Sequence, residues 1–179
     1  MQEQTNRIPL WLAVALTVIF SLPFGLWLGP FNFTLWCAFI VWTEYFVLGA
    51  TLKVVPIIVK NFAYSAVLTG GSVALIPFFG FLPDLVTPGD LATGTALTLG
   101  VAFMVYSMRW AAVFQHGALP FFNGISMALA VNFSGQFPHF GPEALQPLVA
   151  AGWALAMALF GIILGIFTVA AQLPTTKAR

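Results

Sequence analysis

The sequence predicts an all-α, polytopic membrane protein with six transmembrane helices. Of its 179 residues, 60% are hydrophobic and only 6% are charged, whereas a soluble domain carries about 25% charged residues. Hydrophobic runs of roughly the 20 residues that a helix needs to cross a bilayer alternate with short polar or proline-rich segments. The positions of the basic residues, considered below, support the same number of crossings.

The predicted spans form one transmembrane domain over residues 8–171, between a polar N-terminal segment, residues 1–7, and a polar tail, residues 172–179. The first apolar run exceeds the apolar region of a signal peptide, about 7–15 residues, and lacks a small-residue cleavage site. We therefore expect it to be a retained helix. The six predicted spans are Ile8–Gly29, Phe31–Gly49, Asn61–Phe81, Leu91–Met108, Ala118–Phe133 and Leu148–Ala171.

Small residues suggest where these helices approach one another. Gly25 and Gly29 form a G-x-x-x-G pair in the first span, and Gly161 and Gly165 form another in the sixth, a spacing that allows close contact between helix backbones. The sequence Gly-Gly-Ser at 70–72 gives the third span a narrow waist, suited to close packing or to a kink.

The connections differ in character. Pro30 predicts a tight turn between the first two spans, which makes them antiparallel neighbours. Segment 50–60 is apolar but holds two lysines, so we expect it to lie at the membrane surface. Residues 83–90 and 134–147 have the composition of loops, and residues 109–117 are a connector. The fifth span is the shortest and most polar, and its Pro120 predicts a bent or broken helix.

The charges test this topology independently. All six basic residues fall on the N-terminal side of the predicted membrane, and three acidic residues fall on the other side. This is the positive-inside pattern, which predicts that both termini are cytoplasmic. The basic residues are Arg7, Lys53, Lys60, Arg109, Lys177 and Arg179, and the acidic residues of the opposite loops are Asp84, Asp90 and Glu143.

A short internal similarity raises the possibility of a repeat. Pro77–Gly80 (PFFG) resembles Pro120–Gly124 (PFFNG). Three spans followed by three more would give an inverted 3+3 repeat, as in many transporters. Two short matches in a phenylalanine-rich chain also arise by chance, and both interpretations stay open here.

Two stretches carry a resemblance to a known family. They are Trp36–Ala50, which ends in Tyr45-Phe46 and Gly49-Ala50, and Val101–Gln136, which closes on the sequence NFSGQ. In this order they resemble the bacterial inner-membrane family labelled domain of unknown function 1097. The resemblance implies a small multi-helix protein of the bacterial inner membrane, and it implies no activity, substrate or catalytic residue.

Glu44 is the residue on which the functional hypothesis depends. It lies inside the second span, where a carboxylate costs about 2–4 kcal/mol on insertion scales. A functional interpretation makes it a proton or cation site, or the lining of a solute path. Two structural interpretations are equally open: the carboxylate reaches the headgroups, or it pairs with a charged or titratable group of the same side. The possible partners are Lys53, Lys60, Arg109 and His116.

The fifth span supplies further polar candidates. Asn123 and Ser126 are three residues apart and share a helix face, and Asn132 follows near the end of the span. Such side chains either bind a neighbouring helix or line a passage. Phe121 and Phe122 are candidates for a hydrophobic constriction of that passage.

Several functions are disfavoured. The chain has no P-loop, no H-E-x-x-H and no G-x-G-x-x-G motif, and no basic run that would bind nucleic acid. Cys37 is the single cysteine, which excludes an intrachain disulfide. His116 and His139 fall on opposite faces, so we expect no metal site. We expect neither an enzyme nor a cofactor.

The sequence therefore predicts a channel or transporter for a small neutral or weakly acidic solute, which forms a homo-oligomer in the lipid bilayer of the bacterial inner membrane. The proposed path follows Glu44, Asn123, Ser126 and Asn132. The alternative is a structural or accessory subunit that binds lipid or a larger membrane complex, in which case the same polar residues serve helix packing alone.

Overall fold

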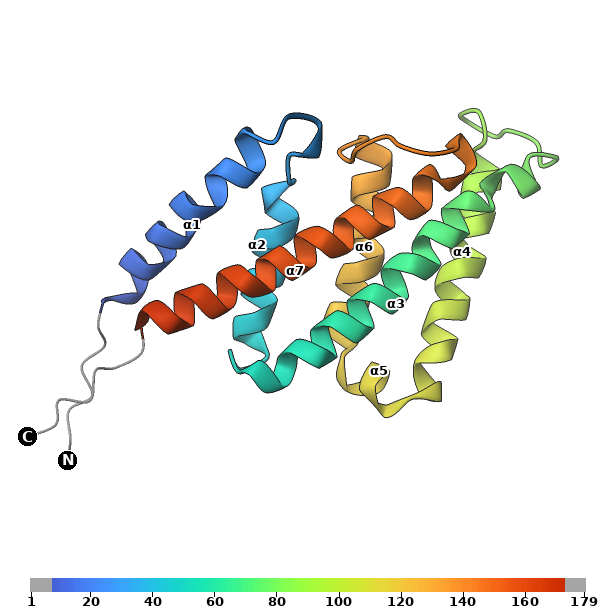
Figure 1. Cartoon of the computed structure of the whole chain (residues 1–179). Helices are drawn as coiled ribbons and strands as arrows, with labels where there is room; N and C mark the ends of the chain where they lie inside the picture. The colour runs from blue at the N-terminus through green and yellow to red at the C-terminus, as the bar shows by residue number, and fades with distance from the viewer. Residues whose placement is uncertain (1–7, 173–179) are drawn as a thin grey trace, which may run out of the picture.

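The computed structural model describes residues 8–172, and every regular element in this part of the chain is helical (Figure 1). The α-helices are α1 (Leu10–Leu26), α2 (Leu35–Val47), α3 (Val55–Ala74), α4 (Asp90–Ser107), α5 (Ala112–His116), α6 (Ala118–Ser134) and α7 (Gln146–Gln172). Short 3₁₀ helices lie between them: η1 (Gly29–Phe31), η2 (Leu52–Val54), η3 (Ile76–Phe79), η4 (Met108–Trp110) and η5 (Glu143–Leu145).

The two longest helices, α3 and α7, run side by side and form the centre of the bundle (Figure 1). Helix α7 crosses α2, and α3 crosses α6, so that α2 and α6 lie together on one side of the central pair. Helix α1 packs on α7 at one edge, and α4 packs on α3 at the other.

The connections gather at two ends of the bundle. One end holds η2, η4 and α5, together with the start of α1 and the end of α7 (Figure 1). The other end holds η1, η3 and η5. Lys53 lies in η2 and Arg109 in η4, whereas Asp90 begins α4 and Glu143 begins η5. These four charged residues therefore lie at the ends of the bundle that the sequence predicts for them.

Within residues 8–172, three helical segments are long and apolar enough to cross a membrane: Leu52–Ala74, Asp90–Trp110 and Glu143–Gln172. Helices α1 and α6 are apolar but have 17 residues each, and α2 has 13. Each of the six predicted spans overlaps one of these helices, but the first two are shorter than predicted and α3 ends at Ala74 rather than at Phe81. At 1.5 Å per residue, 13 residues cover about 20 Å, less than the roughly 30 Å of a bilayer core.

The shortening of the first two spans has a backbone cause. Gly29 has φ +60°, and Gly49 and Ala50 have φ +104° and +52°. These left-handed conformations cannot continue a right-handed helix. Helix α1 consequently ends at Leu26 rather than at Gly29, and α2 ends at Val47 rather than at Gly49. Helix α2 also begins at Leu35 rather than at Phe31, because the ψ angles of Asn32 and Thr34, 133° and 88°, are not helical.

Other boundaries also correct the predictions. Helix α3 begins at Val55 rather than at Asn61, because Pro56 occupies the first turn, where a missing N–H costs no hydrogen bond. The connector 109–117 contains the short helix α5. The prediction that the fifth span is broken is wrong, since α6 is one continuous helix with Pro120 in its first turn.

Only one of the two G-x-x-x-G pairs brings helices together. A side chain at Gly161 would collide with the carbonyl oxygen of Ala38 on α2, and Gly165 packs on the ring of Tyr45. Gly25 faces the side chain of Leu35, while Gly29 lies in the turn beyond α1. At the narrow waist of α3, a Cβ on Gly70 would lie 2.8 Å from the Pro147 carbonyl oxygen. The waist therefore serves close packing on α7.

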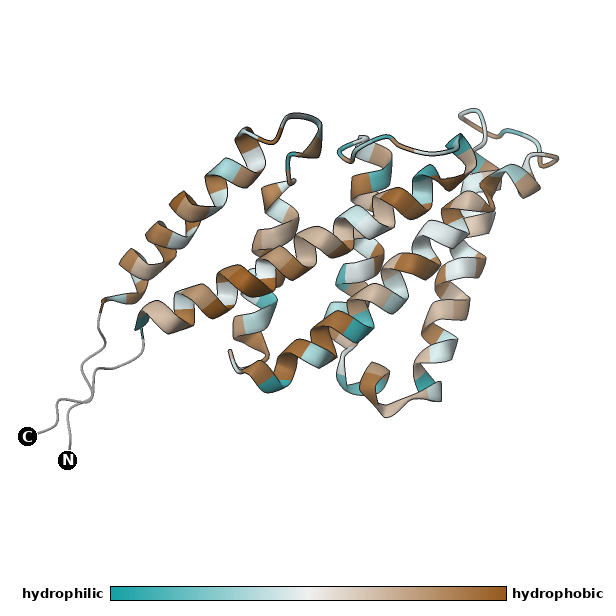
Figure 2. Cartoon of the chain, viewed as in Figure 1, coloured by the Kyte–Doolittle hydropathy of each residue, from teal (hydrophilic) through white to brown (hydrophobic). Residues whose placement is uncertain are grey.

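The outer surface of the bundle is apolar. Hydrophobic residues predominate along the helices in Figure 2, and hydrophilic residues gather mainly at helix ends and connections. Trp11 and Trp27, near the two ends of α1, are 70% and 76% exposed. Large apolar residues exposed to this extent are typical of a lipid or protein interface, which together with the three long helices indicates a membrane-embedded protein.

Candidate functional site

The carboxyl group of Glu44 is buried and contacts a side chain of α6. Glu44 follows two turns after the start of α2 and is only 1% exposed. The amide nitrogen Nδ2 of Asn123, in the second turn of α6, donates a hydrogen bond to Oε2 of Glu44 at 2.7 Å. The second oxygen, Oε1, is buried and has no hydrogen-bond partner. The site thus holds one satisfied and one unsatisfied carboxyl oxygen.

The four predicted charge partners of Glu44 lie elsewhere. Lys53, Lys60, Arg109 and His116 are all exposed. The Arg109 guanidinium lies 3.5 Å from the ring centre of Tyr106, and His116 Nδ1 lies 2.7 Å from the Ala112 carbonyl oxygen. In the described part of the chain, the hydrogen bond to Glu44 comes from the neutral amide of Asn123, not from a cation.

Of the four residues predicted along a solute path, the structure brings two together. Glu44 and Asn123 are hydrogen-bonded, whereas Ser126 is exposed and Asn132 lies half-buried, nine residues after Asn123 on α6. Asn123 and Ser126 therefore do not share one lined face, although their spacing suggested it. Their difference in burial reflects the narrow contact between α2 and α6, which covers Asn123 but not Ser126.

Phe121 and Phe122 also occupy different surroundings. Phe121 is fully buried in a cluster with Met104 and Ile125, and Phe122 is 47% exposed. Because adjacent helical residues point about 100° apart, one ring enters the core between α4 and α6 and the other leaves it. This arrangement does not support a constriction formed by both rings.

Glu44 and Asn123 line a groove of about 510 Å³ between α2 and the first half of α6. Its other walls are apolar or aromatic, apart from Thr43, whose hydroxyl donates to the Phe39 carbonyl oxygen at 2.9 Å. The remaining lining residues are Trp36, Phe39, Ile40, Val47 and Leu119. Glu44 and Asn123 thus supply the carboxyl and amide groups of the groove, and the indole N–H of Trp36 is a further polar group in its lining.

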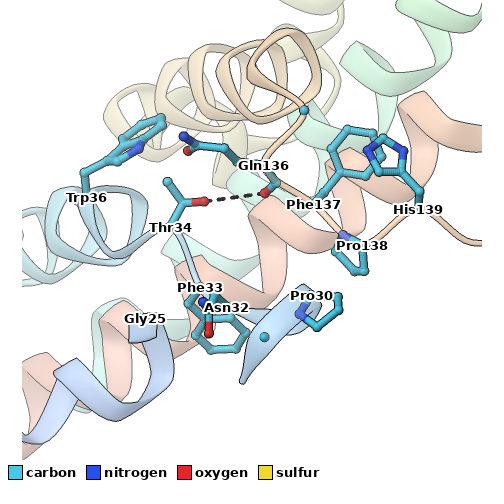
Figure 3. A pocket seen from close by; sticks show the side chains of 12 residues that line it. Gly25, Pro30, Asn32, Phe33, Thr34, Trp36, Gln136, Phe137, Pro138 and His139 are labelled. Carbon is cyan, nitrogen blue, oxygen red and sulfur yellow. Dashed lines mark hydrogen bonds between the residues drawn. The ribbon is translucent and has the colours of Figure 1, made fainter. Parts of the chain in front are cut away.

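A second hollow, of about 700 Å³, lies at the end of the bundle that holds η1 (Figure 3). It forms between the turn after α1 and the segment after α6. Figure 3 shows Thr34 near its centre, with Trp36 to one side and His139 to the other. The Thr34 hydroxyl donates to the Gln136 carbonyl oxygen at 3.4 Å. Trp36 lines both this hollow and the groove, so the two spaces adjoin at its side chain.

Sequence reasoning missed Trp36, but a signal for it exists. The residues that follow Trp36 by four, seven and eleven positions are Ile40, Thr43 and Val47, and Glu44 follows it by eight. Residues at this spacing lie on one face of a helix. Extending the helical face of Glu44 in both directions would have predicted the α2 wall of the groove. The presence of Asn123 in the groove could not be predicted in this way, because it depends on how α6 packs against α2.

The described residues include no group of three side chains suited to hold a metal ion. Cys37 is a free, buried thiol within the core. Comparisons of the chain with protein-family models, with curated proteins and with solved structures give no match. The resemblance to domain of unknown function 1097 accordingly remains a prediction.

Proposed function

We propose that this protein is a small-solute channel or transporter in which the solute passes the Glu44–Asn123 pair. One observation carries the proposal: a buried carboxyl group with an unsatisfied oxygen lines a groove that adjoins an outer hollow at Trp36. A carboxyl group inside an apolar helix is costly, and intramembrane carboxyls commonly mark solute, ion or proton paths.

The proposal includes six crossings of the bacterial inner membrane, with both termini in the cytoplasm. The separation of the described basic and acidic residues to opposite ends of the bundle supports this orientation. Helices α1, α2 and α6 are short for a bilayer, so we expect the membrane to thin around them or the chain to form a homo-oligomer that shields them. Reporter fusions at each terminus test the orientation, and opposite locations would contradict it.

The packing of the helices supports an inverted 3+3 repeat. Helix α1 packs on α7 as α4 packs on α3, and α2 packs on α7 as α6 packs on α3. The helices α1, α2 and α3 thus have counterparts in α4, α6 and α7. In this arrangement the Glu44–Asn123 hydrogen bond joins the two halves, which is where many repeat transporters bind their substrates.

Flux into liposomes tests the transport function. Wild-type protein, Glu44→Gln and the control Glu143→Gln are reconstituted, and entry of glycerol, urea and acetate is followed by stopped-flow light scattering. We expect wild type and Glu143→Gln to accelerate at least one solute over protein-free liposomes, and Glu44→Gln to lose most of that acceleration. Glu143 is an exposed residue of η5, so its variant matches the chemical change outside the groove.

The second candidate is an accessory subunit that binds lipid or a larger membrane complex. The observation that favours it is the exposure of large apolar residues along α1, including Trp11 and Trp27. In that case Asn123 serves only to hold α6 against α2. Wild-type liposomes that take up all three solutes no faster than protein-free liposomes would contradict transport and favour this function.

A further inference from the structure

The polar atoms of the groove are mostly hydrogen-bond acceptors. Asn123 uses one of its two N–H groups on Glu44 Oε2, and its amide oxygen and Glu44 Oε1 remain as acceptors. The donors that remain are the second N–H of Asn123 and the indole N–H of Trp36. The hydroxyl proton of Thr43 is already given to the Phe39 carbonyl oxygen. A buried acceptor without a partner is unfavourable, and a ligand with several N–H donors would satisfy it.

The groove also lacks a cation to balance an ionised Glu44. The basic groups nearest in sequence, Lys53 and Lys60, are exposed, and Arg109 lies over the ring of Tyr106. Anionic ligands would be repelled by the carboxylate. A ligand ammonium would instead form a charge-assisted hydrogen bond with it, which is among the stronger polar interactions in proteins.

The walls select for an apolar body on such a ligand. Ile40, Val47 and Leu119 supply aliphatic surface, and the rings of Trp36 and Phe39 can receive either an apolar group or a cation over their faces. Because Val47 is 67% exposed, the groove opens on the outer surface of the bundle. A membrane-dissolved amphiphile therefore reaches it from the side.

We propose that the groove between α2 and α6 binds an apolar primary amine in its ammonium form, with Glu44 as the counter-ion and Asn123 holding the carboxylate in place. The proposal deepens the proposed function, and it rests on that function for the claim that the bound amine is a solute in transit. It adds a cation that carries N–H donors to the neutral and weakly acidic solutes of the flux assay.

Equilibrium binding to the full-length chain in detergent tests this. Tritiated 4-phenylbutylamine is the probe, and scintillation proximity measures its binding to wild type, Glu44→Gln and the control Glu143→Gln. We expect saturable binding, at one site per chain, to wild type and to Glu143→Gln, and at least tenfold weaker binding to Glu44→Gln. The neutral analogue 4-phenylbutanol should compete at least tenfold less well than unlabelled amine.

A second variant keeps the test valid if Glu44→Gln fails to fold, which circular dichroism and size-exclusion chromatography would reveal. Ile40→Trp fills the groove from its α2 wall and leaves the carboxyl group unchanged. Ile40 is 42% exposed, so the larger ring is accommodated at the surface. We expect this variant to fold and to bind the amine at least tenfold more weakly.

Two results would overturn the proposal. The first is equal amine binding by wild type and a folded Glu44→Gln, which is expected if the carboxyl group simply holds a proton. The second is that 4-phenylbutanol competes as well as the unlabelled amine. Its failure is distinguishable from failure of the transport function. Amine binding without flux of glycerol, urea, acetate or the amine itself contradicts transport alone, whereas glycerol, urea or acetate flux without amine binding contradicts the amine alone.

Discussion

The two sides of α2 differ sharply in how closely a neighbouring helix approaches. On one side, Gly161 of α7 packs on the backbone of Ala38, and no room is left for a side chain. On the other side, α6 stands off and leaves the groove beside Glu44. The first contact buries glycine and mainly apolar or aromatic side chains, while the second encloses a carboxyl group and an amide. The comparison teaches that one helix can pack closely on one neighbour and leave an open groove toward another.

The largest expected effect is at the α2–α7 seam. Gly161→Leu forces a side chain into the Ala38 backbone, and overpacking of this kind costs about 1–3 kcal/mol or more. Gly152→Leu is the matched control on the same helix, because no atom lies within 4 Å of a Cβ built there. We expect the thermal midpoint in detergent to fall by several degrees for Gly161→Leu only. Equal midpoints would mean that α2 and α7 are not tightly packed.

The groove is expected to respond more mildly. Asn123→Ala removes the one hydrogen bond to the Glu44 carboxyl group, and an unsatisfied buried acceptor costs about 1–3 kcal/mol. The control is Asn132→Ala, which removes the same amide from the far half of α6 and should change the free energy of unfolding by less than about 0.5 kcal/mol. Unfolding by sodium dodecyl sulfate measures both. A larger loss of unfolding free energy for Asn132→Ala than for Asn123→Ala would contradict the assignment of the stabilising polar contact to Glu44 and Asn123.

The α1–α7 contact offers a third case, in which two helices pack closely around a pair of polar side chains. The hydroxyls of Thr17 and Thr168 are buried and 2.8 Å apart. A double-mutant cycle with Thr17→Val and Thr168→Val should give a coupling of about 0.6 kcal/mol, the average for hydrogen bonds between membrane helices. A coupling of zero would show that α1 is held by its apolar contacts alone.

The smallest effect is expected at Ser126. Its side chain is exposed and outside the groove, so Ser126→Ala should leave unfolding within about 0.5 kcal/mol of wild type. Solute flux in liposomes should also be unchanged. A loss of flux comparable to that of Glu44→Gln would show that the path runs along the outer face of α6 rather than past Asn123.

Individual residues show how far prediction from the sequence extends. Six helices appear where the apolar runs predict them, and Lys53, Arg109, Asp90 and Glu143 lie at the predicted ends. The errors occur where backbone geometry overrides composition: Gly49 adopts φ +104° just after the end of α2, and Pro120 lies in the first turn of a helix that it was expected to bend or break. Glu44 could be singled out because its charge conflicts with its surroundings.

The sequence by itself determined the helical class, the positions of the helices and the polarity of the two ends, because these depend on local hydrophobicity and charge along the chain. Only the tertiary structure decided that Asn123, and not Ser126 or a basic residue, meets Glu44. Which side chain reaches Glu44 depends on the distance between α6 and α2, and the position of α2 in turn depends on its close contact with Gly161 of α7. Distances between helices follow from the packing of distant residues, which no local pattern records.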